Sequence, residues 1–161
     1  MKELFEDTEL GLSAEQIGDF ERDRGSSFPE DFKIYLKEIN GGWLNDSADF
    51  QFGDGHITGA RNLFGFNGSE DRDITTESKR DSLPRCLLPI GDDLGGADLF
   101  VLDLRPEMIG KVYIRAINVP PNRKPFLPAS LFVERDEERL YHRVADSFSE
   151  FIDMIAGRAR N

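Results

Sequence analysis

The chain has 161 residues, and its 31 Asp and Glu outnumber its 20 Lys and Arg, which gives a formal net charge of −11 at pH 7. This length predicts a single domain over residues 1–161 with a core of its own, and the one cysteine, Cys86, excludes an intramolecular disulfide and a zinc site made of several cysteines. The acidic balance disfavours direct binding to nucleic acid or to an anionic membrane surface, because both depend on clustered Lys and Arg.

The first predicted helix spans Ala14–Arg24. Ser13 and Gln16 have the spacing of a capping box, in which each side chain accepts a hydrogen bond from the backbone N–H of the other residue. Gly25 fits the left-handed conformation that commonly ends a helix. These signals are local, so we expect both helix ends to lie where the sequence places them.

The second predicted helix begins at Pro29, whose fixed φ and missing N–H suit a first helical turn. The apolar residues that follow have the spacing of one buried helical face: Phe32, Tyr35, Leu36 and Ile39. We expect the helix to stop at Asn40, Gly41 and Gly42, because these residues tolerate positive φ.

Short strands and turns are predicted after the second helix. Residues 50–52 alternate between apolar and polar, Asp54 and Gly55 have the pattern of a type I′ hairpin turn, and His56 begins the returning strand. Residues 67–86 contain few apolar side chains, which predicts a long exposed connection.

Three further strands are predicted in the second half of the chain, over residues 87–90, 99–104 and 111–115. Pro89 places the first of them at a sheet edge or at an irregular start, because proline cannot donate to a sheet ladder. The acidic, glycine-rich stretch 91–98 is predicted to be a turn. Residues 118–130 hold several prolines and are predicted to form a loop.

A C-terminal helix is predicted after Ser147, which forms a second capping box with Glu150. Its buried face consists of apolar residues at helical spacing: Phe148, Phe151, Ile152 and Ile155. Helices at both ends of an antiparallel meander predict an α+β fold, a mostly antiparallel sheet with the N-terminal helices and the C-terminal helix on one face. The other face of the sheet would then be free for use.

The sequence gives little support for an enzyme. Its only imidazoles are those of His56 and His142, and no H-E-x-x-H, G-x-S-x-G or Walker pattern occurs. The turn 91–98 offers carboxylates, but their spacing fails the EF-hand pattern, so we expect no metal, no cofactor and no catalytic residue. A carboxylate pair that hydrolyses glycosides stays open as a third interpretation, because 31 acids leave many possible pairs.

The first seven residues are MKELFED, which place acids where a signal peptide needs a basic start and an apolar run. No window of the sequence approaches the roughly 18 apolar residues that a membrane span requires. Together with the lone cysteine, which suits a reducing compartment, these features predict a cytoplasmic location.

Three segments, in order, resemble the signature of the SUKH superfamily, whose domain is also described as cell-wall assembly regulator-like. The first covers residues 21–42, with a Pro-x-Asp-aromatic start and an Asn-Gly-Gly stop. The second is Leu-Pro-Ile-Gly-Asp at 88–92, and the third is Ala-Asp-Ser-Phe at 145–148. The resemblance extends over about residues 13–156. It implies an α+β fold and, in bacteria, an immunity protein that binds and neutralises a polymorphic or contact-dependent toxin, often a nuclease.

Two sets of candidate residues follow. Some motif residues are explained by the backbone conformation that their positions require, and these are expected to determine the fold: Pro29, Asn40, Gly41, Gly42, Pro89 and Gly91. The only tryptophan, a residue type enriched in binding hot spots, and an acidic patch near it are expected to bind the partner: Trp43, Asp46, Asp49, Asp92, Asp93 and Asp98. Two alternatives stay open, a core or rim role for Trp43 and a purely solvated role for the aspartates.

The charge distribution indicates the kind of partner. Residues 1–50 carry a net charge of −8, residues 51–100 carry −4, and residues 101–161 carry +1. Such a field attracts a basic protein, so we predict non-catalytic inhibition of a cognate toxin, a basic nuclease-type domain, through the acidic surface. The alternatives are a cytoplasmic scaffold or regulator of cell-wall assembly and an acidity that only confers solubility.

Residues 67–86 and the loop near 120–128 depart from the family pattern and are expected to be partner-specific.

Overall fold

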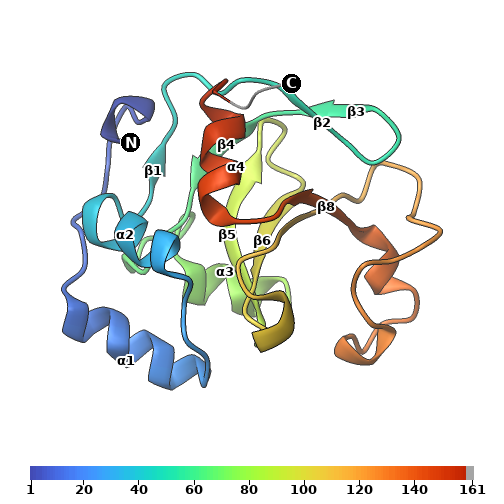
Figure 1. The fold of residues 1–161 in the computed structure, drawn as a ribbon, viewed down its shortest axis with the longest axis horizontal. Coiled ribbons are helices and arrows are strands. Elements are labelled where there is room, and N and C mark those ends of the chain that lie inside the picture. The colour runs from blue at the N-terminus through green and yellow to red at the C-terminus, as the bar shows by residue number, and fades with distance from the viewer. Residues whose placement is uncertain (159–161) are drawn as a thin grey trace.

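The computed structural model describes residues 1–158 and has an α+β fold built on one six-stranded antiparallel sheet (Figure 1). The strands follow one another across the sheet in the order β1 (Gly42–Trp43), β4 (Ala60–Leu63), β5 (Leu87–Asp93), β6 (Leu99–Asp103), β7 (Val112–Arg115) and β8 (Tyr141–Ala145). A separate hairpin is formed by β2 (Phe50–Phe52) and β3 (His56–Thr58). The helices are α1 (Ala14–Arg24), α2 (Glu30–Glu38), α3 (Ile74–Arg80) and α4 (Phe148–Ile155), with 3-10 turns at Lys2–Leu4, Pro106–Met108, Ala129–Leu131 and Glu137–Leu140. Within the described residues, no helix has the length and apolar character needed to cross a membrane.

The ends of α1 confirm the predicted punctuation, and the starts of α2 and α4 differ from it in detail. Ser13 and Gln16 bind each other's backbone N–H at the start of α1, and Gly25 ends that helix with a φ of 69°. Ser147 caps α4 by accepting the backbone N–H of Glu150 at 3.1 Å, but the predicted capping box is incomplete, because the Glu150 carboxylate accepts the backbone N–H of Asp146 instead of that of Ser147. Helix α2 begins one residue later than predicted, at Glu30, so Pro29 is its N-cap and not its first helical residue.

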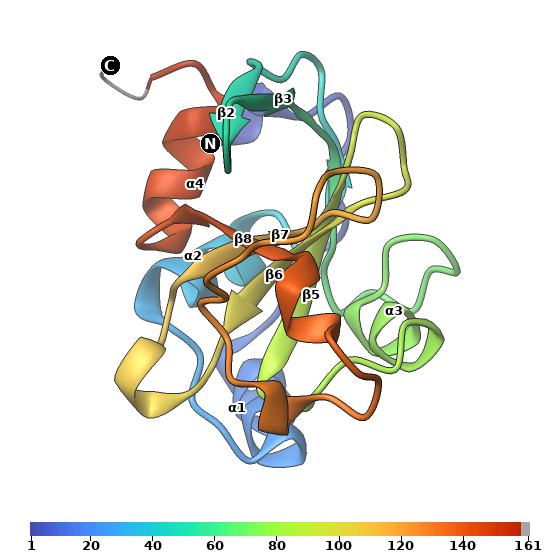
Figure 2. The same ribbon diagram turned by 90° about the vertical axis from the view of Figure 1, so that its right-hand side faces the viewer.

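Helices α2 and α4 lie on the same side of the sheet and pack against each other (Figure 2). The ring centroid of Phe148 in α4 lies 5.0 Å from those of both Phe32 and Tyr35 in α2. Phe151 of α4 lies 4.9 Å from Phe100 of β6, centroid to centroid. Aromatic side chains therefore fill the space between the helices and the sheet, and the predicted α+β arrangement is confirmed.

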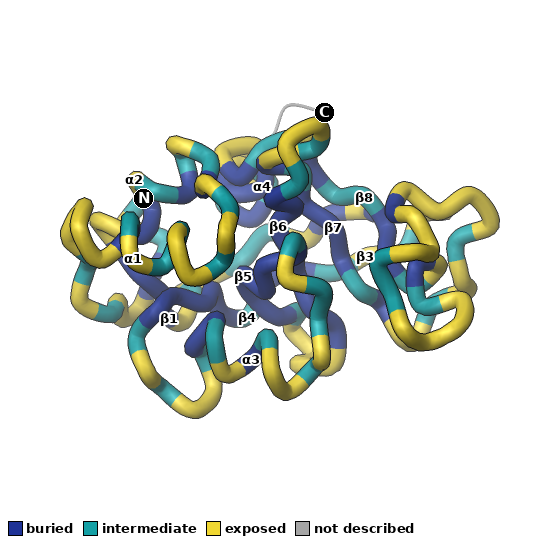
Figure 3. Tube along the Cα trace, turned by 90° about the horizontal axis from the view of Figure 1, so that it is seen from below, coloured by how far each residue is buried: buried dark blue, intermediate teal, exposed yellow. Residues whose placement is uncertain are grey.

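The second face of the sheet is not free, contrary to the prediction. Every residue of β6 is buried, so both faces of this strand are covered (Figure 3). The chain between β7 and β8 covers the second face, where Phe126 contacts Tyr113 of β7 and Phe132 contacts Tyr141 of β8. The reason is the continuous apolar run in β6, which a sheet with one solvated face would leave half exposed.

Residues 67–86 also differ from the predicted exposed connection, because they contain α3. Asp73 caps this helix by accepting the backbone N–H of Thr76 at 2.9 Å. Ile74 is fully buried, and Glu77 is buried as well. A single buried apolar residue in a polar stretch produces no helical period, so hydrophobic periodicity could not reveal α3.

Strands β5, β6 and β7 confirm the three strands predicted in the second half of the chain. Pro89, however, lies inside the sheet, since β5 is flanked by β4 and β6. Strand β4 pairs only with residues 91–93 of β5, and the β5–β6 register shifts between Pro89 and Gly91. The missing N–H of Pro89 therefore falls at an irregularity, which is how a central strand accommodates a proline.

The hairpin β2–β3 occurs where it was predicted, but its turn is of another kind. Phe52 pairs with His56, which leaves a loop of three residues instead of two. Asp54 at the centre of this loop does not have the positive φ that a type I′ turn requires, so that assignment was wrong.

Candidate functional site

The only tryptophan stands at one edge of the sheet, on the two-residue strand β1. Trp43 is 37% exposed, and the guanidinium carbons of Arg61 and Arg72 lie 5.4 and 5.6 Å from its ring centroid. Cations at such distances are attracted to the face of an aromatic ring. Two cations thus hold an exposed Trp43 in place. We use the name Trp43 face for the surface formed by Trp43, Asp46, Asp49, Arg61, Arg72 and Leu94.

The start of β1 is fixed by Asn40, which is buried and has a left-handed φ of 53°. Its side-chain amide donates to the carbonyl groups of Leu10 at 2.9 Å and Phe66 at 3.2 Å, and its Oδ1 accepts the backbone N–H of Phe66 at 2.9 Å. Gly42 then passes the N-terminal segment so closely that a Cβ would lie 2.1 Å from the carbonyl oxygen of Asp7. One side chain and one close backbone contact therefore set the position from which Trp43 projects.

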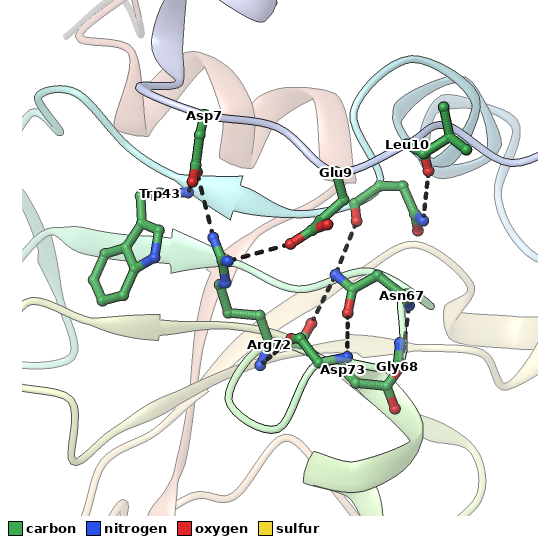
Figure 4. A network of polar contacts seen from close by, with 10 residues as sticks. Asp7, Glu9, Leu10, Trp43, Asn67, Gly68, Arg72 and Asp73 are labelled. Atoms are coloured by element: carbon green, nitrogen blue, oxygen red, sulfur yellow. Dashed lines mark hydrogen bonds and ion pairs between the residues drawn. The ribbon is translucent and has the colours of Figure 1, made fainter.

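Arg72 connects the Trp43 face to the acidic N-terminal segment (Figure 4). Its guanidinium pairs with Asp7 at 3.3 Å and with Glu9 at 3.2 Å, and its side chain is mostly buried. The Asp7 oxygen in this pair also accepts the backbone N–H of Trp43 at 3.1 Å. The charge of Arg72 is therefore balanced by two carboxylates, one of which also holds the strand that carries the indole.

Asp73 organises the loop that carries Arg72. Its Oδ2 accepts the backbone N–H groups of Asn67 at 3.0 Å and Gly68 at 2.8 Å, while its Oδ1 caps α3. The side-chain amide of Asn67 in turn donates to the carbonyl of Asn40 at 3.2 Å (Figure 4). The loop and the end of α2 thus share one hydrogen-bond network, which positions Arg72 against the tryptophan.

Arg61 of β4 is positioned by an ion pair with Asp92 on the neighbouring strand β5. Burial raises the pKa of the Asp92 carboxyl, and the positive charge of Arg61 opposes this shift. The hydrogen bond to Asp92 raises the pKa of Arg61. A buried carboxylate therefore anchors the cation beside Trp43.

A shallow hollow of about 440 Å³ opens beside the indole. Asp46 and Asp49, from the loop that follows β1, line it together with Arg61 and with Leu94, which is 55% exposed. Both aspartates are exposed, and neither forms an ion pair with any residue between 1 and 158. The structure therefore brings three of the six residues predicted to bind a partner, Trp43 and these two aspartates, to one place.

The other three predicted aspartates are engaged within the fold. Asp92 is 6% exposed and Asp98 is 9% exposed, which corrects the expectation that they belong to an exposed acidic patch. Asp98 accepts the backbone N–H of Ile117 at 3.0 Å, and burial raises its pKa. Asp93 is half-buried and accepts the backbone N–H groups of Ala97 and Asp98 at 3.1 and 3.0 Å. Asp93 thus stabilises the β5–β6 turn, whereas Asp92 holds Arg61 of β4 and Asp98 holds the chain that follows β7.

Sequence reasoning did not identify Arg61 and Arg72 as neighbours of Trp43. Each lies in a different segment of the chain, and no short-range pattern connects an arginine to an aromatic ring that far away. The acids ahead of α1 were the available signal, because Asp7 and Glu9 both pair with Arg72 in the folded protein.

Comparisons with known proteins agree with this architecture. The profile of the SMI1 / KNR4 family (SUKH-1) matches residues 11–154. The matched span includes α1, α2, α3, the hairpin and the whole six-stranded sheet, and therefore all residues of the Trp43 face. No curated protein matches the chain.

Proposed function

Because the chain belongs to the SMI1 / KNR4 family (SUKH-1), we propose that it is an immunity protein that binds a cognate toxin and neutralises it. The family is known for immunity proteins against polymorphic toxins, and its members are generally non-catalytic immunity or regulatory proteins. The partner that fits best is a basic toxin domain of the nuclease type, bound at the Trp43 face. The protein would act in the cytoplasm, where such a toxin meets its substrate.

The observation that carries this proposal is an exposed tryptophan that is already held in place. Trp43 contacts two guanidinium groups, and the loop behind it is tied down by Asn40 and Asp73. A side chain that is ordered before binding loses little conformational freedom on binding, which favours affinity. Tryptophan is also among the residue types that most often dominate interface energies.

The charges around the indole favour a basic partner. Glu6, Asp46 and Asp49 are exposed and form no ion pair in the described part of the chain, and the backbone N–H of Glu6 donates to the carbonyl of Trp43 at 2.9 Å. Unpaired acids near an aromatic anchor attract Lys and Arg during encounter and raise the association rate. The aromatic anchor then slows dissociation.

Occlusion is sufficient to explain neutralisation. A nuclease binds its substrate through Lys and Arg that contact phosphates, and an acidic protein that covers those residues excludes the nucleic acid. A specific interface of standard size buries about 800 Å² on each partner, so it would extend beyond the hollow over the surrounding Trp43 face. No bond needs to be made or broken by the immunity protein.

We also propose that residues 1–161 form one domain and that the motif residues act through the fold, not through contact with the toxin. Asn40 supports this by its three hydrogen bonds, and Gly91 by its proximity to β4, where a Cβ would lie 2.7 Å from the carbonyl oxygen of Asn62. The same role is proposed for the other motif residues: Pro29, Gly41, Gly42 and Pro89.

The experiment begins by immobilising the purified protein and identifying what it retains from a lysate of its source strain at low and at high salt. The retained toxin domain is then titrated against the wild type, Trp43→Ala and the double variant Asp46→Lys with Asp49→Lys. Two controls match these changes: Ile109→Ala removes an exposed apolar side chain elsewhere, and Glu107→Lys reverses an exposed acid in the 3-10 turn that follows β6. Growth of cells that express the toxin reports neutralisation.

We expect Trp43→Ala to weaken binding at least about 30-fold, the loss of one hot spot, and the double variant to lower the association rate and its salt dependence. Both controls should bind and protect as the wild type does. Unchanged affinity and protection in both Trp43-face variants would refute the proposed surface. Retention of several envelope-assembly proteins and no toxin would favour the scaffold alternative instead.

A further inference from the structure

A second hollow, of about 670 Å³, lies at the opposite edge of the sheet from the Trp43 face. The edge strand β8 contributes His142 and Arg143 to its lining. The walls of the hollow are the turn of the β2–β3 hairpin and the proline-rich segment after β7, which lie close to each other in Figure 1. Because β1 and β8 are the outermost of six strands, these two edge strands are about 24 Å apart across the sheet.

The hollow has an excess of positive charge in a chain that is otherwise strongly acidic. Arg123 and Lys124 are exposed on its wall, and neither forms an ion pair with any residue that the structure describes. Arg143 is already paired with Asp146, and Asp54 is the acid that lines the hollow. Two unpaired cations therefore face one carboxylate.

The lining of the hollow also includes side chains that the fold holds in place. His142 is only 5% exposed, its ring lies 5.6 Å from that of Phe52, and a Cβ on Gly53 would lie 3.1 Å from its Nδ1. The Nε2 of His142 is buried and has no hydrogen-bond partner among the described residues. The His142 ring is therefore held in the wall of the hollow with one ring nitrogen unpaired. Phe126, which is 46% exposed, adds an apolar contact at the rim.

We propose that this hollow binds an acidic peptide segment that carries one aromatic or aliphatic side chain. Carboxylates of the segment pair with Arg123 and Lys124, and its apolar side chain packs against Phe126 and the rigid wall made by Pro120 and Pro121. The hollow runs beside the edge strand of the sheet, a place where extended peptides bind in other proteins. The segment belongs to another polypeptide chain.

The observations favour a peptide over a nucleic acid. Two unpaired cations suit two carboxylates, whereas a nucleic acid needs many more phosphate contacts to overcome the repulsion from a net charge of −11. The inference does not rest on the toxin-binding proposal.

The test uses the full chain and a short labelled synthetic peptide, rich in Glu and Asp with one Phe, and measures binding by fluorescence anisotropy. The key variant combines Arg123→Glu with Lys124→Glu, and Phe126→Ser is tested separately. The matched control combines Lys37→Glu with Lys79→Glu, which removes two exposed and unpaired cations on helices α2 and α3. A lysine-rich peptide, inorganic phosphate and a single-stranded oligonucleotide serve as alternative ligands. Urea unfolding of each variant checks that it is folded.

We expect the acidic peptide to bind, and the charge reversal at Arg123 and Lys124 to weaken it at least about tenfold, since charge-assisted contacts dominate. Phe126→Ser should weaken binding severalfold, and the control should leave it unchanged. Amide chemical shifts of Gly53 and His142 should move on titration. The proposal is overturned if the acidic peptide does not bind, if the control variant weakens it equally, or if phosphate or the oligonucleotide displaces it at lower concentration.

Discussion

Replacement of Asn40 should destabilise the protein strongly, because this side chain connects three segments. Asn40→Ala removes three hydrogen bonds to backbone groups, two of them buried, at about 1 kcal/mol each. It also leaves alanine at a φ of 53°, which adds about 1 kcal/mol. We therefore expect the free energy of unfolding to fall by about 4 kcal/mol for Asn40→Ala and by about 3 kcal/mol for Asn40→Gly, since glycine tolerates this φ.

The assay is urea unfolding followed by circular dichroism and by tryptophan fluorescence, which reports the site directly because Trp43 is the only tryptophan. The control is Asn118→Ala, an exposed position where the loss should stay within about 0.5 kcal/mol. A loss below about 1 kcal/mol for Asn40→Ala, or a glycine variant less stable than the alanine variant, would refute this account of the Asn-Gly-Gly motif.

Three further predictions concern the residues around the two surfaces. Gly65→Ala should cost at least about 2 kcal/mol by urea unfolding, because its Cβ would lie 2.0 Å from the backbone carbonyl oxygen of Asn40; an unchanged midpoint would contradict this. Asp73→Ala should cost about 2 to 3 kcal/mol and speed amide hydrogen exchange in α3, since the carboxylate accepts three backbone N–H groups, and protection equal to that of the wild type would argue against the cap. Burial, together with the charge of His56, lowers the pKa of His142 below 6.5, while Asp54 and Asp98 oppose the shift. The unfolded chain then binds a proton more readily than the folded protein, so stability should fall as pH drops below about 6.5, and His142→Phe should reduce this fall in urea midpoints measured across that range.

The sequence was sufficient to predict the helices whose ends and buried faces are specified by residues close together in the chain. Capping residues such as Ser13 and Gly25 specify helix ends through contacts within a few residues, and the apolar period of α2 and α4 defines their buried faces. Helix α3 was missed because its stability comes from Asp73, whose carboxylate serves the helix and a loop at the same time. Such shared contacts exist only after folding.

The residues of the proposed site could be selected from the sequence only where they are neighbours in the chain. Trp43, Asp46 and Asp49 lie near one another in sequence and in space, so composition and spacing were enough to select them. Asp92 and Asp98 were misread because an aspartate at the end of a strand looks the same in sequence whether it faces solvent or pairs inside the sheet. The pairing of Asp92 with Arg61 depends on the β4–β5 register, which no local pattern encodes.

The composition of the Trp43 face has a consequence for how recognition can change over evolution. Its outer members, Asp46, Asp49 and Leu94, sit on two loops and are exposed, whereas the anchors beneath them, Asn40 and Asp92, are buried. Exchanging an exposed loop residue typically changes folding stability by no more than about 0.5 kcal/mol, yet one such residue in an interface alters affinity far more. On the proposed toxin-binding role, a lineage of such proteins can diversify its targets by successive loop substitutions without passing through unstable intermediates.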